Sequence, residues 1–115
     1  KVNMEEVNFP QLGTVMLKLL HPTSAVCGMP QQVTMKDIIK NENYDRELYS
    51  GYLGPVNIHD HTQIFVNLRC MQVTSDKLVF YAGAGITEDS EPTKEFLETE
   101  MKMDVLRKFV LNQYQ

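Results

Sequence analysis

The chain has 115 residues, of which 43% are hydrophobic, 23% charged and 9% aromatic. This length allows one domain at most, and the composition is that of a globular rather than a disordered protein. The net charge of −4 has the wrong sign for attracting phosphate backbones or anionic lipids, so we expect neither nucleic acid nor a membrane as a partner.

Two short helices are predicted in the N-terminal third. Apolar residues recur at the spacing of one helix face in Leu12, Val15, Met16, Leu19 and Leu20. His21 and Pro22 end this helix, and the small, polar segment 21–28 predicts a loop. A second helix is expected from Pro30 to about residue 41. Its buried stripe would be Met35, Ile38 and Ile39.

After Asp45 the period of the pattern changes to two, which predicts strands. The three expected strands are residues 49–53, 64–71 and 77–84, with polar turns at 59–62 and 74–76. Short turns between consecutive strands imply antiparallel pairing. Tyr49 would lie on the first strand, and Arg69 in the middle of the second, on the face opposite Val66.

A long amphipathic helix is predicted to close the chain from Glu91, with Ser90 as its N-cap. Its apolar stripe would be Phe96, Met103, Leu106 and Val110. Helix, helix, three strands and helix make an α+β arrangement. A three-stranded sheet leaves two edges unpaired, and the chain begins with Lys1 rather than Met. We therefore expect the chain to be part of a larger protein.

The last helix carries the strongest candidates for chemistry. Glu95, Glu98 and Lys102 share one helix face, at the margin of the apolar stripe. Two such carboxylates can hold a divalent cation, and the lysine can bind an anionic group. The alternative is a solvated face with Glu98 and Lys102 as an ion pair, and spacing alone favours it because charged helix faces are common.

Three further features each have a functional and a structural interpretation. The segment 81–86 (YAGAGI) follows a strand and could offer backbone N–H groups to a carboxylate, or form a turn that needs positive φ. Arg69 could pair with a carboxylate of the protein or of a ligand, or be a solvated arginine. Tyr49 could offer its hydroxyl to the same ligand, or make a structural hydrogen bond.

The histidines and cysteines are less informative. The tripeptide His59-Asp60-His61 falls in an expected hairpin turn, and a solvated turn is favoured over a metal site because no third ligand is nearby. Cys27 and Cys70 have no CxxC or Cys/His spacing. This favours two reduced, packed side chains in a cytoplasmic protein.

Four motifs in this order resemble the C-terminal part of the chorismate-utilising enzymes, most closely the isochorismate synthases. They are HPTSAVCGMP at 21–30, YDRELYSGYLGPVN at 44–57, FVNLRC at 65–70 and YAGAGITEDSEPTKEFLETEMKM at 81–103. The resemblance covers nearly everything from His21 onward and implies that residues 1–115 are the C-terminal portion of a chorismate-binding domain, within the larger fold of that family.

The resemblance also implies roles for individual residues. Glu98 matches a direct ligand of Mg²⁺, and Glu95 matches the glutamate that holds the water shell of the metal. The positions that match those binding the carboxylates of chorismate are Tyr49, Arg69, Lys102 and the backbone of Gly85. At the position of Ala25, the isochorismate synthases resemble this chain in having alanine, whereas the salicylate and anthranilate enzymes typically have threonine.

The catalytic lysine and glutamate of the family lie upstream of the matched region, so we assign no catalytic residue in this chain and expect it to be inactive alone. The expected whole protein is a cytoplasmic, Mg²⁺-dependent isochorismate synthase that serves menaquinone or siderophore biosynthesis. The alternatives are a salicylate or anthranilate/aminodeoxychorismate synthase, or a non-catalytic chorismate-binding domain. Unpaired strand edges and apolar surface lead us to expect that the isolated chain self-associates.

Overall fold

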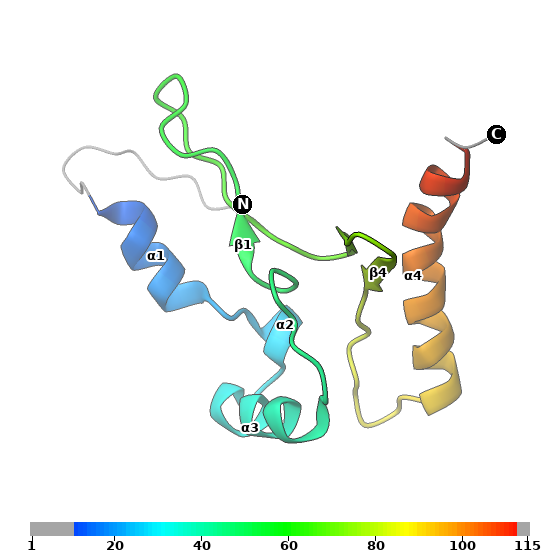
Figure 1. Cartoon of the computed structure of the whole chain (residues 1–115). Coiled ribbons are helices and arrows are strands. Elements are labelled where there is room, and N and C mark those ends of the chain that lie inside the picture. Colours follow the sequence, from blue (N-terminus) through cyan, green and yellow to red (C-terminus); the bar gives the residue numbers. More distant parts are fainter. Residues whose placement is uncertain (1–10, 113–115) are drawn as a thin grey trace.

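The computed structural model describes residues 11–112, so the expectation based on Lys1 lies outside the described residues. The helices are α1 (Leu12–Leu20), α2 (Ser24–Cys27), α3 (Gln31–Asn41) and α4 (Pro92–Asn112), and the strands are β1 (Tyr52–Leu53), β2 (Phe65–Val66), β3 (Cys70–Val73) and β4 (Leu78–Tyr81). The helices α1–α3 lie on one side of the chain and α4 on the other, with β4 next to α4 and β1 above α2 and α3 (Figure 1). The mixed, antiparallel α+β class is confirmed.

The N-terminal helices begin and end close to the predicted residues. The segment 21–28, predicted as a loop, contains the one-turn helix α2, because the Thr23 carbonyl accepts hydrogen bonds from the N–H groups of Val26 and Cys27. Gly28 ends this turn at a φ of 73°, a conformation that glycine adopts without steric cost. The buried stripe predicted for α3 is wrong at Ile39, which is 72% exposed.

The strands differ from the prediction in number and pairing. Four strands form two separate antiparallel pairs, β1 with β2 and β3 with β4, instead of one three-stranded sheet. The predicted second strand is broken at Arg69, whose φ of 48° lies outside the extended region. Arg69 is therefore at a bend between β2 and β3 and not in mid-strand. Tyr49 is in a turn before β1 and not on a strand.

The tip of the first hairpin has the expected turn. His59 and Asp60 have φ values of 50° and 60°, and a bridge joins Ile58 to His61. All three residues of the His-Asp-His tripeptide are exposed. Within residues 11–112, no three His, Cys, Asp or Glu side chains gather into a possible metal-binding group.

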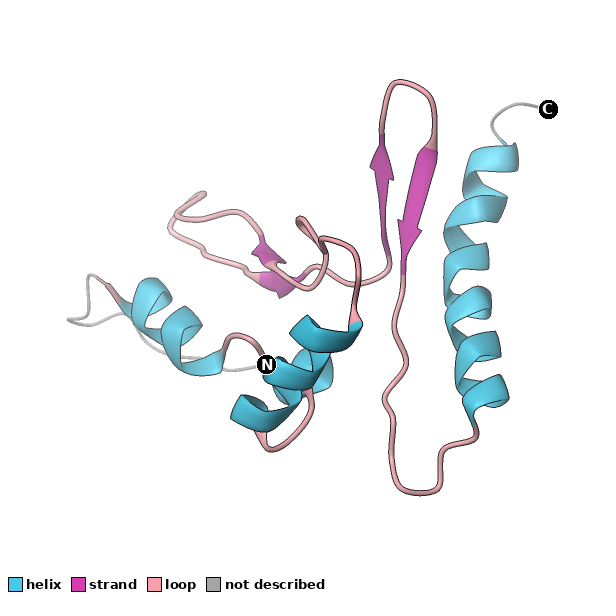
Figure 2. Cartoon of the chain, turned by 60° about the horizontal axis from the view of Figure 1, so that its bottom comes forward, coloured by secondary structure: helices cyan, strands magenta, loops and turns pink. Residues whose placement is uncertain are grey.

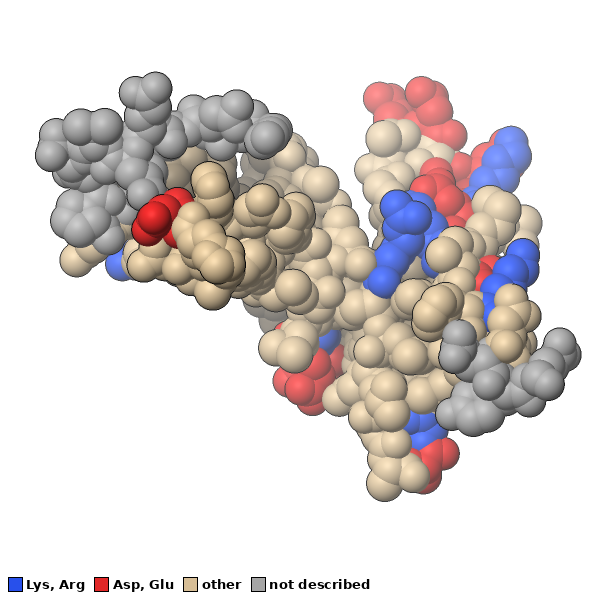
Figure 3. All heavy atoms as spheres, turned by 90° about the horizontal axis from the view of Figure 1, so that it is seen from above, with Lys and Arg blue, Asp and Glu red and all other residues tan. Residues whose placement is uncertain are grey.

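The long helix α4 runs beside β4 in the β3–β4 hairpin (Figure 2). Its predicted stripe is half-buried at Met103, Leu106 and Val110, but Phe96 is 62% exposed and does not belong to it. A second set of apolar side chains on α4 is exposed, namely Leu97, Met101, Val105 and Phe109. Seen from above, the charged side chains gather over the side of the molecule on which α4 lies (Figure 3).

The chain as a whole is open. Its radius of gyration is 17.1 Å, against about 13 Å for a compact chain of this length. Among the described residues only Cys27, Tyr49 and Ser50 are buried, while twenty-two large hydrophobic side chains are exposed. No described helix combines the length and the apolar character that a bilayer span requires. These apolar surfaces have no cover within the described residues.

Candidate functional site

A cavity of about 290 Å³ lies where five segments of the chain meet. Residues from α2, from the turn after α3, from the bend before β3, from the strand exit after β4 and from α4 line it. Its lining includes all five residues that the sequence analysis nominated for substrate binding, Ala25, Tyr49, Arg69, Gly85 and Lys102. Residues that are up to 77 positions apart in the sequence are thus brought to one site.

Tyr49 is fixed by the turn that carries it. Its N–H donates to the Arg46 carbonyl at 2.8 Å, and the next N–H, of Ser50, donates to the Asn67 carbonyl at 2.8 Å. The ring of Tyr49 stacks on that of Tyr81, with centroids 5.5 Å apart. Burial raises the pKa of the Tyr49 phenol. The hydroxyl therefore remains a protonated hydrogen-bond donor at neutral pH.

The strand exit after β4 brings two glycines to the cavity. An added Cβ at Gly83 would lie 2.7 Å from the Tyr49 hydroxyl oxygen, whereas one at Gly85 would meet nothing within 4 Å. Neither glycine has positive φ, so the expected turn with positive φ is wrong. The absence of a Cβ at Gly83 leaves room for the Tyr49 hydroxyl to approach the backbone.

Lys102 reaches the cavity from α4. Its Nζ donates to the Gly83 carbonyl at 2.9 Å and forms an ion pair with Glu98 Oε1 at 2.5 Å. This is the ion pair that spacing alone favoured. Arg69 reaches the same cavity from its bend and is exposed, and within residues 11–112 it forms no ion pair. Besides Arg46, which pairs with Glu42, the two cationic groups of Lys102 and Arg69 therefore face this cavity, an arrangement suited to a ligand with carboxylates.

Neither candidate metal ligand, Glu95 or Glu98, lines the cavity, and Glu98 contacts the lining residue Lys102. Glu95 accepts a hydrogen bond from Ser90 Oγ at 2.8 Å, and Glu98 uses Oε1 for its ion pair with Lys102. Two carboxylates are a donor set that Mg²⁺ commonly takes, because it retains water and substrate oxygens in its remaining positions. These residues fit part of a magnesium site.

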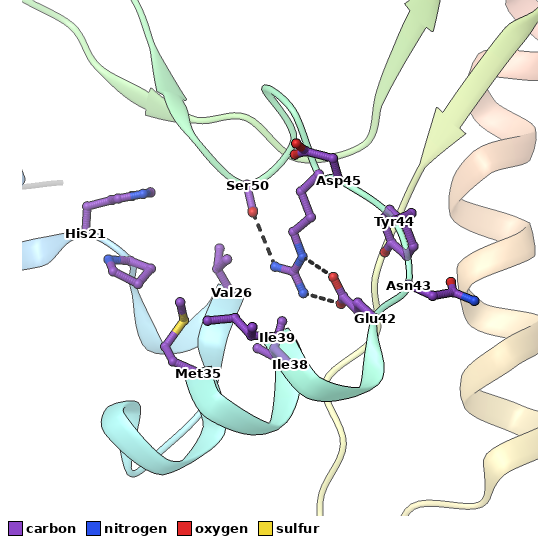
Figure 4. A pocket seen from close by; sticks show the side chains of 12 residues that line it. His21, Val26, Met35, Ile38, Ile39, Glu42, Asn43, Tyr44, Asp45 and Ser50 are labelled. Carbon is purple, nitrogen blue, oxygen red and sulfur yellow. Dashed lines mark hydrogen bonds and ion pairs between the residues drawn. The ribbon is translucent and has the colours of Figure 1, made fainter.

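Sequence reasoning missed part of the lining, chiefly Glu42, Tyr44 and Arg46, which also border a second cavity of about 650 Å³ (Figure 4). Burial raises the pKa of Tyr44, as it does that of Tyr49. The signal was the i, i+4 spacing of Glu42, just before the motif at 44–57, and Arg46, within that motif. Such pairs are common on solvated helices, so the spacing does not indicate a site.

Comparison with known proteins gives a consistent picture. Residues 11–111 match the family described as chorismate binding enzyme. The chain is similar to the vibriobactin-specific isochorismate synthase of Vibrio cholerae, with 37% identity over 76% of this chain and 22% of the relative. It is also similar to isochorismate synthase EntC of Escherichia coli, with 35% identity over 76% of this chain and 22% of the relative.

A plant protein, the chloroplastic isochorismate synthase of Catharanthus roseus, is 38% identical over 82% of this chain and 16% of its own length. The chain thus spans about a fifth of the length of these curated relatives. No solved structure matches the chain.

Proposed function

Because this chain belongs to the chorismate-binding enzyme family, we propose that it is the C-terminal portion of an isochorismate synthase. The whole enzyme isomerises chorismate to isochorismate, adding water at one ring carbon while the hydroxyl leaves from another. The similarity to proteins that are named isochorismate synthases supports this reaction. Two free cysteines suit a cytoplasmic enzyme.

One observation carries the proposed substrate site, namely that Lys102 and Arg69 face the same cavity as the Tyr49 hydroxyl and the Gly85 backbone. Chorismate is a dicarboxylate, and these two cations with two neutral donors complement it in charge. The cavity volume of about 290 Å³ is near the lower end of the range for small-molecule sites. Lys102 and Arg69 would each bind a carboxylate and so orient the ring.

For the metal, we propose that Glu98 binds Mg²⁺ directly and that Glu95 holds its water shell. A carboxylate has two oxygens that can bind a cation. Only Oε1 of Glu98 takes part in the ion pair with Lys102, so Oε2 is the atom that would bind the metal. When bound, the ion would clamp a ring carboxylate and stabilise charge that develops in the reaction. The remaining ligands would come from water, from the substrate and from the rest of the enzyme.

The general base and general acid belong, in this proposal, to the rest of the polypeptide. Water addition needs a base, and hydroxyl loss needs an acid, and the family resemblance assigns these roles to a lysine and a glutamate outside the matched motifs. We expect the isolated chain to bind substrate weakly and to produce no isochorismate. Ala25, which lines the cavity, supports an isochorismate synthase over a salicylate or anthranilate enzyme.

The test is a product analysis on the full-length protein. Given chorismate and Mg²⁺, it should yield isochorismate by chromatography, with no pyruvate in a coupled assay and no dependence on ammonia. Stoichiometric pyruvate would instead indicate a salicylate synthase. Tight binding of chorismate without any product would indicate a non-catalytic chorismate-binding domain.

A further inference from the structure

A short polar wall separates the two cavities of the chain. Val26, Glu42, Tyr44 and Arg46 line both the cavity of about 290 Å³ and the neighbouring one of about 650 Å³. In Figure 4, dashed lines join the arginine of this wall to the labelled Glu42 and Ser50. The wall therefore forms the back of the proposed substrate site.

Arg46 uses its whole guanidinium group within the wall. Its Nε donates to Glu42 Oε2 at 2.6 Å, its Nη2 pairs with Glu42 Oε1, and its Nη1 donates to Ser50 Oγ at 3.3 Å. The guanidinium carbon lies 5.7 Å from the centroid of the Tyr49 ring. Arg46 thus ties the end of α3 to the turn that carries Tyr49.

The contacts continue from Tyr49 across the cavity. The Tyr49 hydroxyl stands over Gly83 so closely that a Cβ there would lie 2.7 Å from it. The carbonyl of Gly83 in turn accepts the hydrogen bond from Lys102 Nζ at 2.9 Å. A continuous line of contacts therefore runs from Glu42 and Arg46, through Tyr49 and Gly83, to Lys102.

We propose that Arg46, held by Glu42, is a positioning residue that fixes the Tyr49 hydroxyl, and through Gly83 the Lys102 ammonium, for the carboxylates of the substrate. This inference rests on the proposed function, because the roles of Tyr49 and Lys102 in binding belong to it. Arg46 acts through its neighbours and not on the substrate, because all three nitrogens of its guanidinium group are engaged, Nε and Nη2 by Glu42 and Nη1 by Ser50. The hydrogen bond to Glu42 further raises the pKa of Arg46.

Lysine cannot replace Arg46 in this role. A planar fork donates to Glu42 and Ser50 at once while its face lies over the Tyr49 ring, whereas an ammonium is a point charge without that geometry. Arg46→Lys therefore keeps the charge and removes the orientation. Arg107 is a matched control. It also pairs with two carboxylates, those of Glu100 and Asp104, and its guanidinium carbon lies 5.7 Å from the centroid of the Phe80 ring. It lines neither cavity.

The experiment is a double-mutant cycle in the full-length enzyme, with kcat and KM for chorismate as readouts. Arg46→Lys should raise KM about tenfold and change kcat less than about twofold, because positioning of carboxylate ligands acts on ground state and transition state alike. In the Tyr49→Phe background, the same substitution should change KM by less than about twofold. Arg107→Lys should leave both constants unchanged. Glu42→Gln, which keeps Arg46, should repeat the KM effect.

Equal effects of Arg46→Lys with and without the Tyr49 hydroxyl would overturn the proposal, as would an equal effect of Arg107→Lys. An independent readout is the NMR spectrum of the protein with ring-¹³C tyrosine, assigned through Tyr49→Phe. Arg46→Lys should shift the Tyr49 resonance and leave that of Tyr52 in place, and an unshifted Tyr49 resonance would also overturn it. The NMR readout needs no turnover. If the full-length protein is inactive on chorismate, the proposed function is refuted, but the NMR spectrum still shows whether Arg46 positions Tyr49.

Discussion

Substituting Gly83 by alanine tests the close contact between the strand exit and Tyr49. The new Cβ would lie 2.7 Å from the Tyr49 hydroxyl oxygen, and ordinary contact begins at 3.4 Å, so the oxygen must retreat by about 0.7 Å. The Tyr49 ring cannot swing freely, because it is stacked on Tyr81 at 5.5 Å and only 9% exposed. Forcing an extra carbon into such a packed site typically costs about 1–3 kcal/mol.

The assay is urea unfolding of the full-length protein, followed by circular dichroism. Gly83→Ala should lower the free energy of unfolding by about 1–3 kcal/mol. Gly85→Ala is the matched control, and it should change this free energy by less than about 0.5 kcal/mol, because its Cβ meets nothing within 4 Å. In a Tyr49→Phe background the hydroxyl is gone, so Gly83→Ala should lose most of its cost. Equal costs in the two backgrounds would refute the contact.

Three further predictions concern the metal, the isolated chain and alkaline pH. Glu98→Gln should lower the Mg²⁺-dependent activity of the full-length enzyme about tenfold or more, and the nearby control Glu88→Gln should not; equal losses would contradict the metal assignment. Light scattering of the isolated 115-residue chain should show oligomers, and a compact monomer with a cooperative thermal transition would contradict this. Because burial raises the pKa of Tyr49, its stabilising contribution is complete below the ordinary tyrosine value and is lost as pH rises through the folded value. Tyr49→Phe should therefore reduce the alkaline loss of stability in a pH series of urea midpoints.

Hydrophobic periodicity predicted the positions of α1, α3 and α4 well, but it did not predict which of their apolar side chains are buried. Periodicity shows which face of a helix is apolar. Whether that face is buried depends on a partner, and Ile39 and Phe96 are exposed because no described part of the chain packs on them. The helix α2 has only four residues, which is too short for any period to be recognised.

The break at Arg69 could not be read from the sequence, because a positive φ is uncommon for any residue other than glycine and the apolar alternation continues on either side. Tyr49, Arg69, Lys102 and the segment 81–86 were nominated from their residue types and spacing, and Ala25 from motif resemblance, but neither kind of argument carries information about distance. The Arg46–Glu42 pair was missed because its spacing is typical of solvated helices. Its burial, with side chains 23% and 26% exposed, arises only from tertiary packing.

The cavity draws its walls from both sides of an open chain, Ala25 from α2 and Lys102 from α4. A ligand that contacts both walls binds the folded chain and not the unfolded one, so binding and folding are thermodynamically linked. At a hundredfold excess over its dissociation constant, such a ligand adds about 2.7 kcal/mol to the stability of the folded state. If the proposed substrate binds in this cavity, its removal should lower the stability of the folded state by the same amount.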